Sequence, residues 1–125
     1  MTLLAGLRAR SAEPVDDLRS LVLAISRIPY GRPPARTPEA VVETWRGTCS
    51  DKHLLLRAVA PELDAAPRVE LVHRVYVVDR ATAGRLWGPA MAAQVPAAGL
   101  VDVHTYAVVT PPGVAVDTSL YNPPP

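Results

Sequence analysis

The spacing of apolar residues divides the chain into a helical first half and an extended second half. Apolar side chains recur every three to four positions over residues 15–25, directly after an acidic stretch, which predicts an amphipathic helix. A shorter helix is predicted over residues 37–45, where Thr-Pro-Glu is typical of a helix start. A third helix is predicted over residues 48–63, because Thr48 and Asp51 form a capping-box pattern before an apolar run.

Beyond these helices the chain favours strands. Residues 68–79 are rich in valine and predict a strand, whereas residues 81–95 predict a weak helix that breaks at Gly88-Pro89. Two further extended segments flank the turn sequence Thr-Pro-Pro-Gly, which predicts a β-hairpin. If Thr110–Gly113 form the loop, Val109 pairs with Val114, whereas a three-residue loop would move Asp117 to the other face unless a bulge corrected the register.

Helices followed by strands indicate an α+β fold in one domain, residues 1–125. We expect N-terminal helices, with the helix that carries Cys49 packed on an antiparallel sheet. The two ends, residues 1–13 and 121–125, are expected to be flexible.

Composition narrows the classes of function. The chain has 13 basic and 12 acidic residues, and this balance gives no electrostatic signature of a nucleic-acid partner. No apolar run approaches the ~20 residues of a membrane span, so no membrane partner is expected. The single cysteine excludes an internal disulfide and fits a reducing compartment, so we expect a cytoplasmic protein.

That cysteine, Cys49, occupies the first position of the predicted third helix. Unpaired backbone N–H groups and the positive end of the helix dipole favour negative charge there, so a thiolate is stabilised. The same N–H groups are suited to bind an oxyanion. Cys49 is therefore a candidate nucleophile, although a lone cysteine is also compatible with simple packing.

A cysteine nucleophile requires a base, and the predicted hairpin offers one. His104 lies on its first strand and Asp117 on its second. If Val109 pairs with Val114, His104 and Asp117 become diagonal neighbours on one face, within reach of each other. This prediction depends on the register of the hairpin.

Three blocks of this sequence resemble the transglutaminase-like superfamily, whose papain-like fold carries a Cys-His-Asp triad. These are Gly47-Thr48-Cys49, His104-Thr105-Tyr106 and the strand with Asp117, and they span residues 45–120, in the manner of small bacterial members. Tyr106 stands where tryptophan is usual. The resemblance implies thiol-dependent acyl transfer, as hydrolysis or transamidation, through a thioester on Cys49, with a small-molecule or peptide acyl substrate and no cofactor.

Two alternatives remain open at this point. The chain either keeps this fold as a non-catalytic module that binds a peptide or small molecule, or binds a metal ion through Cys49, His53 and His104. Neither the substrate nor the oligomeric state follows from the sequence. The residues expected to line the pocket or contact substrate are Tyr30, Arg32, Trp45, Thr48, Ser50, His53 and Tyr106.

Overall fold

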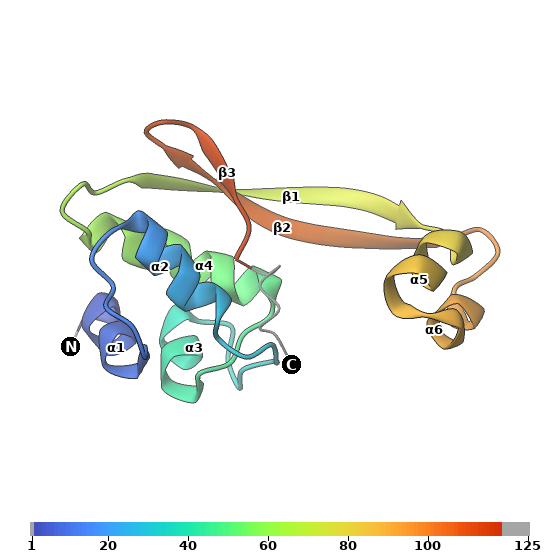
Figure 1. The fold of residues 1–125 in the computed structure, drawn as a ribbon, viewed down its shortest axis with the longest axis horizontal. Coiled ribbons are helices and arrows are strands. Elements are labelled where there is room, and N and C mark those ends of the chain that lie inside the picture. Colours follow the sequence, from blue (N-terminus) through green and yellow to red (C-terminus); the bar gives the residue numbers. More distant parts are fainter. Residues whose placement is uncertain (1, 119–125) are drawn as a thin grey trace. The chain divides into compact units, whose positions relative to one another are not determined.

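The computed structural model describes residues 2–118, so the end predicted to be flexible at 121–125 lies outside the described residues (Figure 1). Its fold is α+β, as predicted. The chain divides into two compact units, Met1–Val72 with Thr105–Pro125 and His73–His104, where the sequence predicted one domain. In chain order the elements are α1 Leu3–Arg10, α2 Leu18–Ser26, α3 Pro38–Thr44, α4 Cys49–Val59, a 3-10 turn Ala60–Glu62, β1 Arg68–Val78, α5 Arg80–Trp87, α6 Pro89–Gln94, β2 Leu100–Thr110 and β3 Val114–Val116.

The three helices predicted in the first half are confirmed, and each begins at a side-chain cap. Asp17 caps α2 and accepts a hydrogen bond from the backbone N–H of Ser20 at 2.8 Å. Thr37 caps α3, which ends at Trp45 in the left-handed conformation with φ of 53°. Thr48 caps α4. These caps satisfy N–H groups that a helix start otherwise leaves unpaired.

The expectation that residues 1–13 are flexible is wrong for most of this stretch. They contain α1, which buries Leu4 and Leu7 in the core of the first unit. The backbone N–H of Leu4 also donates to the Glu62 carboxylate at 3.3 Å. Burial of two leucines contributes a few kcal/mol, at about 1.5–3 kcal/mol each, which holds a short helix in place.

The sheet has the order β1-β2-β3 and is antiparallel. Val109 pairs with Val114 and Ala107 with Val116, which confirms the predicted register of the hairpin. Within the first unit α4 packs on this sheet, and α1, α2 and α3 surround α4 (Figure 1). The core of this unit therefore lies between the helices and the buried side chains of β2, among them Ala107 and Val109.

The second unit consists, in chain order, of the C-terminal part of β1, the helices α5 and α6, and the N-terminal part of β2. The predicted break is confirmed, because α5 ends at Gly88, with φ of 92°, and Pro89 starts α6. Trp87 and Met91 are both exposed. The buried cluster of this unit is small and consists of Val78, Ala83 and Val95.

Candidate functional site

Cys49 is the first residue of α4, as predicted, and its side chain is partly exposed. The capping box is complete: the backbone N–H of Thr48 donates to Asp51 Oδ2 at 3.0 Å, and that of Asp51 donates to Thr48 Oγ1 at 3.5 Å. Just before the cap, Gly47 pairs its backbone with the segment around Tyr30. Cys49 is therefore held at a fixed helix start.

Two backbone N–H groups at this helix start have no hydrogen-bond acceptor among residues 2–118. Those of Cys49 and Ser50 donate no hydrogen bond to any other residue in the part of the chain that the structure describes, whereas the N–H of Lys52 donates to the Thr48 carbonyl at 3.0 Å. Free N–H groups at the positive end of a helix are suited to bind a developing oxyanion. The local geometry thus supplies both a thiol and oxyanion donors.

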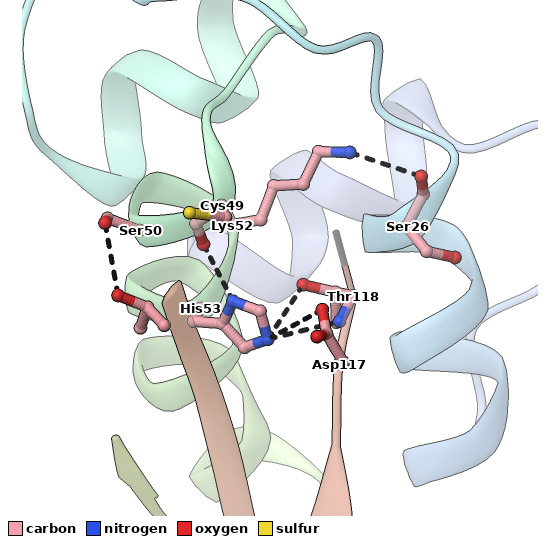
Figure 2. A network of polar contacts seen from close by, with 8 residues as sticks. Ser26, Cys49, Ser50, Lys52, His53, Asp117 and Thr118 are labelled. Atoms are coloured by element: carbon pink, nitrogen blue, oxygen red, sulfur yellow. Dashed lines mark hydrogen bonds and ion pairs between the residues drawn. The ribbon is translucent and has the colours of Figure 1, made fainter. Parts of the chain in front are cut away.

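Lys52 lies one turn after Cys49 and is buried, with 3% of its surface exposed. Its Nζ donates to the carbonyl oxygen of Ser26 at 3.2 Å (Figure 2). Burial lowers the pKa of Lys52, and attraction to negative charge on Cys49 opposes this shift. The first turn of α4 therefore holds a buried lysine three residues after Cys49.

His53 is fully buried one turn below Cys49, and both of its ring nitrogens are occupied (Figure 2). Nε2 accepts a hydrogen bond from the backbone N–H of Thr118 at 3.1 Å, so the proton of the neutral ring is on Nδ1. Nδ1 then donates to the carbonyl oxygen of Cys49 at 2.7 Å. His53 therefore joins the first turn of α4 to the segment that follows β3.

This arrangement gives no support to the metal alternative. No three His, Cys, Asp or Glu side chains among residues 2–118 come together as a metal site. The two nitrogens that His53 would offer to a metal ion already make the hydrogen bonds described above.

Asp117 lies directly after β3, and its Oδ1 is 4.0 Å from Nε2 of His53. The sequence predicts that Asp117 is the carboxylate partner of His104, and that role stays a prediction. Sequence reasoning missed the contact of Asp117 and Thr118 with His53. No local pattern signals a contact between residues 65 positions apart.

The strand that carries His104 approaches the start of α4 through its next residue, Thr105. Thr105 is buried and its hydroxyl lies 3.3 Å from that of Ser50. His104 itself belongs to the second unit. Successive side chains of a strand point to opposite faces, so His104 and Thr105 face opposite sides of β2. The role of His104 as the base stays a prediction.

The other predicted pocket residues differ in their surroundings. Trp45 packs against the core of the first unit, and the guanidinium of Arg10 lies 5.6 Å from its ring centre. Tyr30 is 73% exposed and Arg32 is also exposed, so both are surface residues of the turn. Tyr106 is partly exposed on β2.

No protein family, no curated protein and no solved structure matches this chain. Within residues 2–118, no helix has the length and apolar character that crossing a membrane requires. The residues around Cys49 are therefore the basis for a functional proposal.

Proposed function

We propose that this protein catalyses thiol-dependent acyl transfer, in the manner of a transglutaminase-like acyltransferase or hydrolase, with Cys49 as the nucleophile. The observation that carries the proposal is the start of α4, where a partly exposed thiol lies beside two open N–H groups and a buried lysine. The N–H groups and the lysine both favour negative charge, which the thiolate and the tetrahedral intermediate carry.

In the proposed reaction the Cys49 sulfur attacks the carbonyl carbon of an amide or ester. The carbonyl oxygen becomes an oxyanion beside the N–H groups of Cys49 and Ser50. Collapse of this intermediate breaks the bond to the leaving amine or alcohol, which takes up the thiol proton, and leaves a thioester on Cys49. Water or an amine then attacks the thioester, restores the thiol and releases an acid or a new amide.

The sequence-based prediction that His104 carries the proton, as base and then as acid, is kept in the proposal, although His104 faces the side of β2 opposite to Thr105, which contacts Ser50. His53 has a different role, since both of its nitrogens are engaged and it contacts the Cys49 carbonyl rather than accepting the thiol proton. Its proposed function, and that of Asp117 through it, is to position the first turn of α4.

The proposed substrate is a small molecule or peptide that carries an acyl group as an amide or ester, and the proposed location is the cytoplasm, where a single thiol stays reduced. The site is built on the fixed end of a helix, and rigid placement of the nucleophile favours reaction with a bound carbonyl.

Acylation by a nitrophenyl ester tests the nucleophile. We expect intact-mass spectrometry to show one acyl group on the protein, located on Cys49 and removed by hydroxylamine as a thioester. Cys49→Ala should remove both the adduct and nitrophenol release while leaving Tm nearly unchanged. An adduct that persists in Cys49→Ala, or a wild-type protein that is never acylated, contradicts the proposal.

The base is tested separately with two histidine variants of the strands. His104→Ala should slow acylation by about 10²–10⁴-fold, the usual contribution of a general base. His73→Ala is the matched control, since His73 is an exposed histidine of β1 that the proposal does not use. Equal rates in the two variants would remove His104 from the mechanism and leave Cys49 as nucleophile without it.

A further inference from the structure

Two groups of opposite hydrogen-bonding character lie next to one ring nitrogen of His53. Nε2 is 3.1 Å from the backbone nitrogen of Thr118 and 4.0 Å from Oδ1 of Asp117 (Figure 2). The backbone N–H of Thr118 is a donor, whereas an ionised carboxylate only accepts. Nε2 therefore binds Thr118 when it carries no proton, and it can bind Asp117 when it carries one.

The other ring nitrogen, Nδ1, keeps the same partner in both states. It lies 2.7 Å from the carbonyl oxygen of Cys49, and a carbonyl oxygen only accepts. Nδ1 therefore carries a proton in the neutral ring and also in the charged ring. When His53 takes up a proton, its bond to the first turn of α4 stays in place and only the bonds of Nε2 change.

Asp117 is the acid placed to meet a charged ring, and its side chain is 21% exposed. The buried ionisable side chains among residues 2–118 are Asp51, Lys52 and His53, all in α4. Lys52 donates to the carbonyl oxygen of Ser26, and Oδ2 of Asp51 belongs to the helix cap. The other ionisable side chains of the helices and strands of the first unit are exposed or partly exposed, namely Arg8, Arg10, Arg19, Glu39, Glu43, Cys49, Arg57, Glu62, Arg68, Glu70 and Tyr106.

We propose that His53 is a pH-sensitive switch between α4 and the segment that follows β3. Around neutral pH the backbone N–H of Thr118 holds the neutral ring, and in acid the carboxylate of Asp117 holds the charged ring. Asp117 then closes the distance of 4.0 Å to a charge-assisted hydrogen bond of about 2.7–2.9 Å.

This exchange of partners requires the backbone at Asp117 and Thr118 to turn. Thr118 is buried, and its N–H loses its acceptor when Nε2 takes up a proton. A buried N–H without an acceptor is costly, so the segment moves until this group finds another partner or water. The switch depends on the contacts of His53 alone, and it does not require the acyl transfer proposed above.

Nuclear magnetic resonance of the ¹⁵N-labelled full chain tests the switch without an enzymatic assay. Histidines in proteins titrate mostly between about pH 5.5 and 7.5, so the spectra are recorded from about pH 8 to 5. We expect Nε2 of His53 to gain a proton in this range while Nδ1 stays protonated throughout. The backbone amide signal of Thr118 should move with the same midpoint, and this amide should then exchange faster with water. The variants His73→Gln and His104→Gln assign the ring signals of the other two histidines.

Asp117→Asn tests the acid. An amide oxygen accepts a hydrogen bond without the negative charge, so a charged ring loses its counterion. We expect the midpoint of His53 to fall by about one pH unit, the lower end of what an opposite charge within ~4–6 Å produces. Asp64→Asn is the matched control, because Asp64 is an exposed acid beyond the other end of α4. Its midpoint for His53 should equal that of the wild type.

Three results would overturn the switch. One is a His53 ring that stays neutral in the folded protein down to about pH 5. Another is a titration of the ring that the Thr118 amide does not follow. The third is an equal midpoint in Asp117→Asn and Asp64→Asn. The first two are measured on the wild type, so they do not depend on the folding of any variant. None of the three concerns the acylation of Cys49, so the proposed reaction stands or falls separately.

Discussion

At the scale of single residues, the first turn of α4 concentrates polar groups that elsewhere would be solvated. Lys52, the only lysine of the chain, is buried beside Cys49, and Asp51 is buried with one carboxylate oxygen, Oδ1, that has no partner among the described residues. Burying such groups costs free energy unless each is paired. Their presence at a helix start that carries the only cysteine is consistent with a functional rather than a purely structural role.

Lys52 gives the folded protein a pH-dependent stability with a defined sign. Burial lowers its pKa in the folded state below the ordinary value of 10.5, so the unfolded chain binds more protons between the two values. Stability therefore rises with pH through that window. We expect Lys52→Met to be the more stable protein near neutral pH, and its advantage in Tm to shrink toward about pH 10.

Thermal unfolding of both proteins across this range is the measurement, and the difference in Tm cancels the titration of every other group. Lys52→Arg provides the control. Because arginine keeps its charge over this range, the variant should be less stable than the wild type at each pH. A Tm difference that does not vary with pH would mean that folding does not change the pKa of Lys52.

At the scale of elements, contacts between residues close in sequence could be predicted, whereas contacts between distant segments could not. Thr48 and Asp51 lie three residues apart, so their capping box could be predicted from the sequence, and the turn residues fixed the pairing of Val109 with Val114. The helix α1 was missed because it is short and depends on the burial of Leu7. The site as a whole could be predicted only in part, because its contact between His53 and Thr118 is set by packing of α4 on the sheet.

That contact predicts how strongly α4 and the hairpin depend on each other. In His53→Leu the backbone N–H of Thr118 is buried without an acceptor, which costs about 1–3 kcal/mol. We expect a loss of about 2 kcal/mol in the free energy of unfolding, measured with urea. His73→Leu, at an exposed site on β1, should change it by no more than about 0.5 kcal/mol. Equal losses in the two variants would show that His53 does not join these elements.

At the scale of the whole molecule, the two units differ in what holds them together. The core of the first unit draws buried side chains from four helices and the sheet, whereas the second depends on Val78, Ala83 and Val95. Regions with few buried apolar contacts open locally at lower free energy than a large core. We therefore expect the second unit to open locally without unfolding the first, although the strands β1 and β2 run through both units.

Amide hydrogen exchange tests this difference in stability between the units. In the wild-type protein, amides of α5 should exchange at least about tenfold faster than those of α4, because α5 packs on the smaller core. A tenfold ratio corresponds to ~1.4 kcal/mol in opening free energy. Equal protection of α5 and α4 would instead identify one cooperative domain, as the sequence predicted.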